Sequence, residues 1–282
     1  MKRYKLRYLF EGIIVYAIYY FFKTIPIKKA SIIAGKLVQK ISFIFNRKKL
    51  MRKNIKLCLP NTTEGRVNDI ISLTWYHFGS ILGELPHWQG MKKSEFFKNI
   101  EIINPENIPQ KKAILISGHI GNWELISRIA QEFSINLSLV YRPSNNPYAN
   151  KLINGIRESY GVNLIAKGKA GVKQILNDIK EEKVVGMMVD QKYNEGIAIP
   201  FFGKKAMTTI LPAKIALKHG IPIVMVRVIK VQHLKYKVEF MKPLDVDKND
   251  EKESVMLKVN NILERWIKET PEQWFWFHNR WK

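Results

Sequence analysis

The second half of the chain alternates short apolar runs, rich in isoleucine and valine, with longer amphipathic stretches. The continuous apolar runs predict buried strands at residues 113–117, 137–141, 184–189 and 222–229. Residues 236–240 alternate apolar and polar positions, which is typical of an edge or antiparallel strand. Helical spacing falls between the runs, at residues 123–133, 149–160, 171–182 and 211–219. Continuous strands separated by helices predict an α/β fold with a mostly parallel central sheet flanked by helices on both faces.

The first half of the chain shows helical periodicity without strand patterns. Residues 27–45 repeat apolar positions at intervals of three and four, and residues 74–85 do the same, so we expect a helix at each place. Residues 12–22 form an uncharged run, shorter than the roughly 17 residues that a helix needs to span a bilayer. No small-residue cleavage site follows this run. We therefore expect an uncleaved helix that lies in a membrane or barely crosses it.

Positive charge is concentrated at the same end of the chain. The formal net charge is +23, and residues 1–60 hold fifteen Lys and Arg against one acid, Glu11, so this segment contributes +14 and leaves +9 for the rest. Tyrosine and phenylalanine are interleaved with these cations, as at the interface of membranes. A nucleic-acid partner is not expected, because neither zinc-finger spacing nor an RNP-like aromatic motif is present. We predict an N-terminal segment, residues 1–45, that associates with an anionic membrane, followed by one domain at residues 46–282.

Candidate chemistry gathers between Ser117 and Glu124, where the sequence reads Ser-Gly-His-Ile-Gly-Asn-Trp-Glu. A strand ends at Ser117, a glycine-flanked turn carries His119, and a helix begins near Glu124. Residues five apart on a helix are rotated by roughly 140°, so His119 must lie in the turn if Glu124 is to reach it. A histidine backed by a carboxylate can take a proton from a hydroxyl. The alternative is a loop histidine that caps the helix.

Two further charged residues follow strand ends, where ligands bind in such sheets. Arg142 is either a phosphate or oxyanion clamp or an exposed loop cation, and Asp190 either binds substrate or caps the next turn. Asn122 could cap the helix or orient His119. Arg157 lies on a helix, where it either binds a ligand or faces solvent.

Absent motifs narrow the chemistry further. The chain has no phosphate-binding P-loop, no dinucleotide glycine motif and no nucleophilic serine elbow. Its six histidines lack metal-ligand spacing, so neither a metal nor another cofactor is expected. The lone Cys58 excludes an intrachain disulfide, suits a reducing compartment, and has no base nearby that would make it a catalytic thiol. The simplest remaining use of a His/Glu pair is direct attack of a hydroxyl on a preactivated donor.

The segment from Ser117 to Glu124 resembles the His-x4-Asp/Glu motif of the lysophospholipid acyltransferase superfamily. The variant is that of the late lauroyl/myristoyl acyltransferases of lipid A biosynthesis. Asp190 and Gln191 with residues 199–213 resemble a second block, residues 271–280 a C-terminal signature, and residues 52–60 loosely a basic segment. The resemblance covers nearly the whole chain. It implies a glycerolipid acyltransferase-like fold, an acyl carrier protein as donor and a phosphorylated glycolipid as acceptor. The implied location is the cytoplasmic face of a Gram-negative inner membrane.

With this resemblance, His119 is expected to act as general base and Glu124 to hold the imidazole tautomer, as the acid does in a Ser-His-Asp triad. Backbone donors near 118–121 would hold the oxyanion. The residues expected to bind substrate are Asn122, Arg142, Arg157, Asp190 and Gln191. Two alternatives stay open: a glycerophospholipid or other glycolipid acyltransferase that uses acyl-CoA, and a non-catalytic membrane-binding protein, against which the intact His/Glu pair argues.

Three aromatic positions are also open at this stage. Trp123 is expected to pack rather than to take part in the chemistry. Phe201 and Phe202 either line an acyl chain or belong to the core. The residues at 274, 276 and 278 alternate like a strand, and we expect them to pack.

Overall fold

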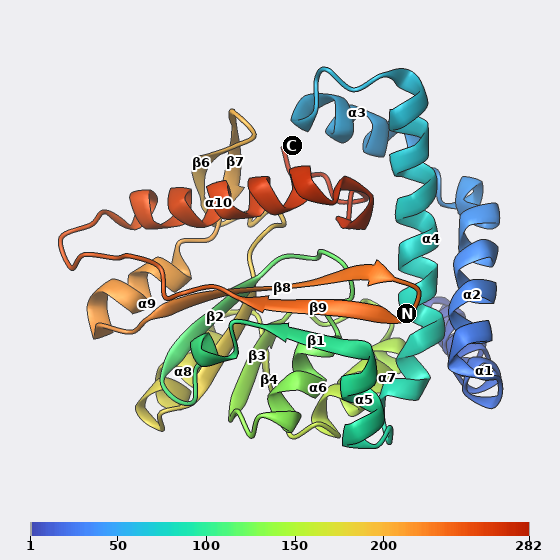
Figure 1. The fold of residues 1–282 in the computed structure, drawn as a ribbon, viewed down its shortest axis with the longest axis horizontal. Helices are drawn as coiled ribbons and strands as arrows, with labels where there is room; N and C mark the ends of the chain where they lie inside the picture. Colours follow the sequence, from blue (N-terminus) through green and yellow to red (C-terminus); the bar gives the residue numbers. More distant parts are fainter. Residues whose placement is uncertain (1, 282) are drawn as a thin grey trace.

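The computed structural model describes residues 2–281, with side chains from residue 6 onward, and contains a central seven-stranded sheet (Figure 1). The strands stand in the order β1-β9-β8-β2-β5-β3-β4. Their bounds are β1 Ile100–Ile103, β2 Ala113–Ser117, β3 Leu137–Tyr141, β4 Asn163–Ala166, β5 Val184–Met188, β8 Ile223–Gln232 and β9 Lys235–Phe240. The β8–β9 pair is antiparallel, and the pairs β1–β9, β2–β8, β2–β5, β3–β5 and β3–β4 are parallel. The predicted α/β fold with a mostly parallel sheet is confirmed.

Helices cover both faces of the sheet, because alternate residues of each strand point to opposite sides. In β2, Ile114 and Ile116 join one hydrophobic core with α8 (Lys169–Lys180), α9 (Leu211–His219) and α10 (Lys252–Glu269). Ala113 and Leu115 join the other core with α5 (Lys93–Asn99), α6 (Leu125–Glu132) and α7 (Pro147–Glu158). The near-continuous apolar run of β2 is thus explained by burial on both faces.

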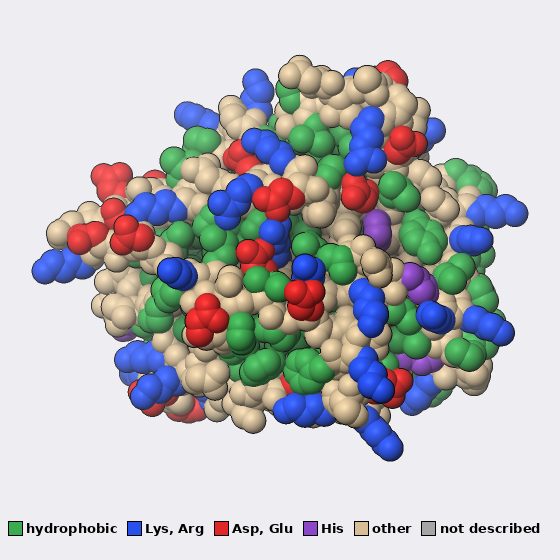
Figure 2. All heavy atoms as spheres, in the orientation of Figure 1, with side chains coloured by type: hydrophobic (Ala, Val, Ile, Leu, Met, Phe, Trp, Pro, Cys, Tyr) green, Lys and Arg blue, Asp and Glu red, His purple; other side chains and the backbone are tan. Residues whose placement is uncertain are grey.

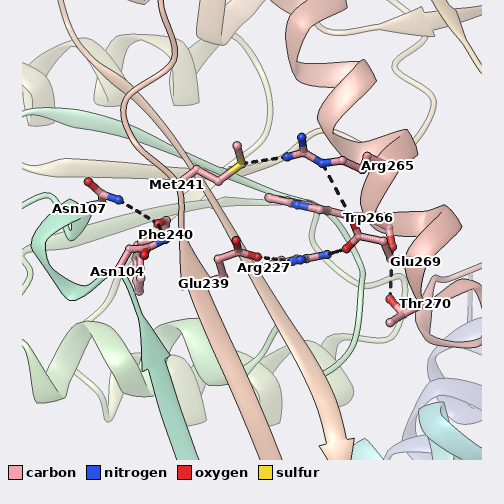
Figure 3. A network of polar contacts seen from close by, with 10 residues as sticks. All are labelled: Asn104, Asn107, Arg227, Glu239, Phe240, Met241, Arg265, Trp266, Glu269 and Thr270. Carbon is pink, nitrogen blue, oxygen red and sulfur yellow. Dashed lines mark hydrogen bonds and ion pairs between the residues drawn. The ribbon is translucent and has the colours of Figure 1, made fainter.

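The contact between α10 and the sheet is partly ionic (Figure 3). Arg227 on β8 pairs with Glu239 on β9 at 2.6 Å and with Glu269 near the end of α10. The guanidinium therefore joins the two strands of the β8–β9 pair to helix α10.

In the described residues, four α-helices come before α5 and the sheet: α1 (Lys2–Thr24), α2 (Ile27–Ile41), α3 (Lys48–Cys58) and α4 (Glu64–Trp88), with the 3-10 turn η1 (Ser42–Phe45) between α2 and α3. Helix α2 lies along α4 at close range (Figure 1). A Cβ atom on Gly79 or Gly83 of α4 would come within 2.5 and 2.4 Å of the carbonyl oxygens of Ala34 and Ala30. Within the described residues, no helix combines the length and the apolar character needed to cross a membrane.

The elements with a clear pattern in the local sequence were predicted, and several others were missed. The bounds of β2, β3 and α9 agree with the sequence pattern, and β9 is antiparallel to β8 but interior, because β1 pairs with its other side. The short strands β1 and β4, the hairpin of β6 (Ile197–Phe201) and β7 (Lys204–Thr208), and α10 were not predicted.

The fold answers the open question about two aromatic segments. The residues after 273, whose pattern alternates like a strand, do not form one. Trp274 makes one isolated bridge to Ile120, and the backbone N–H of Trp276 donates to the carbonyl of Trp274 at 3.0 Å. Both tryptophans are buried, so their predicted packing role is confirmed. Phe201 is buried in the core, whereas Phe202 is partly buried in the hairpin turn with φ at +51°.

Candidate active site

The site begins where β2 and β5 leave the sheet side by side. Ser117 and Met188 are paired at the ends of these strands, so the residues two positions further, His119 and Asp190, meet at the carboxyl edge. Nδ1 of His119 lies 2.8 Å from Oδ1 of Asp190, and the His119 N–H donates to Oδ2 at 3.0 Å. The indole N–H of Trp274 donates to the same Oδ2 at 2.8 Å. The Asp190 side chain is 1% exposed and that of His119 23%, so the carboxylate is buried behind an accessible imidazole.

The surroundings keep Asp190 ionised. Burial by itself raises the pKa of this carboxyl, but the charge of His119 and the hydrogen bonds from His119 and Trp274 outweigh burial and lower the pKa to about 2. An anionic Asp190 accepts a hydrogen bond from Nδ1–H, which leaves Nε2 of His119 as the proton acceptor. The pair therefore has the arrangement of a general base with its orienting acid.

Glu124 does not occupy the position that the sequence analysis assigned to it. Its Oε1 accepts hydrogen bonds from Arg157 at 2.6 Å and from the Trp123 indole at 3.1 Å, and its Oε2 accepts one from Arg157 at 3.0 Å. The expected hold on the imidazole tautomer is therefore wrong for this geometry, because Asp190 occupies Nδ1 and Arg157 engages both Glu124 oxygens.

The Glu124–Arg157 pair nevertheless belongs to the same site. Burial alone would raise the pKa of Glu124, but Arg157, Trp123 and the nearby His119 lower it. Both side chains are mostly buried, so Arg157 is a paired cation rather than a residue of a solvated face. Whether the pair acts in catalysis stays a prediction.

The turn itself is held from the backbone. Gly121 has φ at +56°, and a Cβ atom there would come within 1.9 Å of the carbonyl oxygen of Val228 on β8, so only glycine fits. Its N–H donates to the carbonyl of Gln273, and the Phe275 N–H donates to the carbonyl of His119. These bonds hold the turn against the C-terminal segment, and the lack of a side chain at Gly121 lets it lie close to β8.

The same hydrogen bonds bear on the prediction that backbone N–H groups near residues 118–121 hold the oxyanion. The N–H groups of His119, Ile120 and Gly121 are engaged by Asp190, by the carbonyl of Gly118 and by the carbonyl of Gln273. These three amides are therefore not available to an oxyanion in this conformation.

The other predicted residues lie at varying distances from the reaction centre. Asn122 is buried, its amide lies 3.5 Å from Glu84, and α6 has no side-chain cap, so the expected capping role is not realised. Its role in orienting His119 stays a prediction. Arg142 is exposed, and Gln191 is half-buried; within the described part of the chain neither side chain has a hydrogen-bond partner. Burial is the main cause that lowers the pKa of Lys167 and of His278, and the charge of nearby Arg142 adds to it at both groups.

Sequence analysis missed a row of aromatic rings. His119 lies 5.1 Å from Trp123 and 5.9 Å from Phe275, measured between ring centroids. Phe275 contacts Phe277 at 4.6 Å, and Phe277 contacts Trp75 at 4.1 Å. Trp75 in turn stacks on Phe45 of η1, so the row runs from the imidazole to the N-terminal helices. Trp123, expected only to pack, forms one side of this row.

His278 is a second histidine that sequence analysis did not place near the site. The Lys192 N–H donates to its Nδ1 at 3.4 Å. Burial lowers the pKa of His278 to about 4, so the ring is neutral near pH 7. Its spacing from His119 in the sequence carries no signal of this proximity.

A model of the family described as bacterial lipid A biosynthesis acyltransferase matches residues 1–282. The chain belongs to this family. It is 26% identical to the lipid A biosynthesis lauroyltransferase of Escherichia coli over 261 residues, which cover 88% of this chain and 82% of that protein. It is 22% identical to the lipid A biosynthesis palmitoleoyltransferase of the same organism over 251 residues, covering 85% and 80%.

As a member of the bacterial lipid A biosynthesis acyltransferase family, the protein is an acyltransferase, as the sequence resemblance predicted. Among solved structures it is similar to the 1-acyl-sn-glycerophosphate acyltransferase of Thermotoga maritima, with 13% identity and a TM-score of 0.42 over 95% of this chain and 99% of that one. This likeness is too distant to bear on function. The turn that carries His119 is thus the candidate active site of a lipid A biosynthesis acyltransferase.

Proposed function

We propose that the protein transfers a fatty acyl chain from the thioester of an acyl carrier protein to a hydroxyl of a lipid A precursor. The observation that carries the proposal is the contact between His119 Nδ1 and the buried, ionised Asp190, beside an exposed carboxyl edge of the sheet. Family membership supplies the acyltransferase chemistry and a lipid A-type acceptor. The carrier protein as donor and the inner-membrane location remain part of the proposal.

The proposed reaction needs one base and no covalent enzyme intermediate. Nε2 of His119 takes the proton of the acceptor hydroxyl as its oxygen attacks the thioester carbonyl. Asp190 stabilises the imidazolium that forms. The tetrahedral intermediate then collapses, the C–S bond breaks, and the imidazolium returns the proton to the leaving thiolate. The products are the acylated lipid and the free thiol of the donor.

A lipid acceptor is supported by the exposed apolar surface of the N-terminal helices. Phe43 and Ile44 in η1 are 77% and 65% exposed, and α1 and α2 carry further exposed apolar side chains at Leu6, Leu9, Phe10, Ile13, Ile14, Ile18, Phe21, Ile32, Ile33 and Leu37. Hydrophobic side chains and Lys or Arg lie side by side along this edge of the molecule (Figure 2). We infer that this surface rests on an anionic membrane at the cytoplasmic face, as predicted for residues 1–45. The aromatic row joins it to His119.

A phosphorylated substrate is supported by the order of the strand ends. The neighbouring strands β2, β5, β3 and β4 are followed in turn by His119, Asp190, Arg142 and Lys167. Neighbouring strands are about 4.8 Å apart, so the two cations lie next to the His/Asp pair along one edge. Arg142 has no ion-pair partner among the described residues, and Lys167 stands over the Tyr193 ring. An anionic group of the substrate would fit beside them.

The test is an acyl-transfer assay with the purified, detergent-solubilised protein. A radiolabelled acyl chain is offered as acyl carrier protein thioester and as acyl-CoA, with a tetra-acylated lipid A precursor or a lysophosphatidic acid as acceptor. We expect transfer to the lipid A precursor from the carrier protein. Faster transfer to lysophosphatidic acid from acyl-CoA would favour the glycerophospholipid alternative, and no transfer in any combination would contradict the proposal.

A further inference from the structure

A buried carboxylate on α4, Glu84, connects four separate parts of the molecule. Its side chain is fully buried. Ser31 of α2 donates to Oε1 at 2.7 Å, and Lys230 of β8 pairs with the same oxygen at 2.9 Å. Tyr236 of β9 donates its hydroxyl hydrogen to Oε2, and the amide of Asn122 lies 3.5 Å from Oε2. Glu84 does not reach the reacting atoms itself, but two of these partners, Asn122 and Lys230, connect it to the turn that carries His119.

Two connections run from Glu84 to that turn. The direct one is Asn122, three residues after His119. The second passes through Lys230, whose backbone N–H and carbonyl both bond the side chain of Gln273, at 2.8 and 2.9 Å. The carbonyl of Gln273 then accepts the N–H of Gly121 at 2.9 Å. Losing Glu84 would therefore loosen the part of the turn that follows His119.

Stability alone does not require a carboxylate at this position. Replacing a buried ion pair by apolar groups of similar volume is often neutral or stabilising, because both charges are taken out of water. A fully bonded polar network does, however, define one orientation for every group in it. The orientation that Glu84 defines is that of the segments that hold His119.

A second buried carboxylate, Asp178 on α8, offers a matched comparison. It also pairs with a lysine, Lys183 at 3.2 Å, and it accepts hydrogen bonds from Gln174 and Asn163. Asn163 begins β4 and Lys183 precedes β5, so this network lies at the amino edge of the sheet, opposite the edge that carries His119. The two sites share their chemistry and burial but differ in their relation to the active site.

We propose that Glu84 is a positioning residue for acyl transfer, which holds the turn of His119 through Asn122 and Lys230, while Tyr236 fixes the orientation of its carboxylate. Through Ser31 the same carboxylate also connects that turn to α2, whose far side exposes Ile32 and Ile33. The inference rests on the proposed function, because the reaction it affects is the one assigned to His119.

The first experiment compares Glu84→Gln with Asp178→Asn in the acyl-transfer assay. A misplacement of about 1 Å costs about 10²-fold in rate, so we expect kcat of Glu84→Gln to fall by about that factor while KM for both substrates stays within about twofold. Asp178→Asn should lower the melting temperature to a similar extent and keep kcat within about twofold of the unmodified protein, since it leaves the catalytic geometry in place. Equal loss of kcat in both variants would overturn the proposal.

Milder variants keep the test decisive if Glu84→Gln fails to fold. Tyr236→Phe and Ser31→Ala each remove one hydrogen bond to the carboxylate. We expect Tyr236→Phe to lower kcat roughly tenfold, equivalent to one hydrogen bond to a charged group, and Ser31→Ala to lower it less. Unchanged kcat in Tyr236→Phe would contradict the proposal.

A spectroscopic measurement tests the role of Glu84 independently of acyl-transfer activity. In protein with ¹⁵N-labelled histidine, the Nδ1–H proton of His119, hydrogen-bonded to Asp190, should give a downfield resonance that Asp190→Asn removes. We expect this resonance to broaden or shift in Tyr236→Phe and Glu84→Gln and to persist in Asp178→Asn. Its persistence in all three would overturn the role of Glu84. If the unmodified protein showed the resonance but no acyl transfer, the proposed function would be contradicted. The resonance in the variants would still test whether Glu84 positions His119.

Discussion

At the scale of single residues, the structure distinguishes two carboxylates near one histidine. Asp190 contacts Nδ1 of His119, and Glu124 is paired with Arg157. We expect His119→Ala to lower kcat by about 10²–10⁴-fold, as for removal of a general base. Asp190→Asn should approach about 10⁴-fold, because the amide can donate to Nδ1 and favour the wrong tautomer.

The ranking of the two acidic residues tests this geometry. Glu124→Gln keeps the size of the side chain and leaves Asp190 on the imidazole, so its loss of kcat should be smaller than that of Asp190→Asn. Steady-state kinetics of the three variants, with circular dichroism to verify folding, makes the comparison. A larger loss in Glu124→Gln than in Asp190→Asn would return the orienting role to Glu124.

At the scale of elements, the turn η1 carries two exposed apolar residues that can be substituted without opening the core. Phe43 and Ile44 are largely exposed, so Phe43→Ser/Ile44→Ser should leave the melting temperature unchanged. Full burial of such a side chain in an apolar phase is worth about 1.5–3 kcal/mol, and the double variant should therefore partition at least about tenfold less onto anionic vesicles.

Co-sedimentation with vesicles measures this effect. The matched control is Val172→Ser, because Val172 is an exposed apolar residue of α8, which lies on the opposite side of the molecule from α1 and α2 (Figure 1). Equal binding of the η1 variant and the control would show that this turn does not touch the membrane.

At the scale of the whole molecule, the ionised Asp190 links stability to pH. Its pKa is lowered from 3.8 to about 2 in the folded state, so it stabilises the fold above about pH 4, and this contribution disappears as pH falls towards 2. The shift corresponds to about 2 kcal/mol. Urea unfolding of the unmodified protein and of Asp190→Asn at pH 6, 4 and 3 should show a difference in unfolding free energy that narrows with acid. A difference that widened would reverse the sign assigned here.

The positive field at the carboxyl edge of the sheet is also a property of the whole molecule. Arg142→Ala should raise KM for a bisphosphorylated acceptor more than for its dephosphorylated analogue, and added salt should reduce that difference because the Debye length shrinks to about 8 Å at physiological ionic strength. An equal fall in kcat for both acceptors would instead indicate an oxyanion role. Small and equal effects would leave Arg142 as a plain loop cation.

The sequence by itself determined what depends on neighbouring residues. Buried strands such as β2 and β3 are visible as continuous apolar runs, and the parallel α/β architecture follows from their alternation with helices. The turn with His119 is recognisable because a strand, two glycines and a helix start stand within eight residues. The short β1 and β4 escaped detection because four residues carry too little periodicity.

Tertiary structure decided which groups meet. Asp190 stands 71 positions from His119, and the parallel pairing of β2 with β5 brings them together. A spacing of five residues made Glu124 the nearer candidate, but Arg157 on α7 holds its carboxylate instead. Glu84 was not singled out from the sequence, because its partners come from α2, β8 and β9. Side-chain partners from distant segments depend on strand order and helix packing, which local periodicity does not encode.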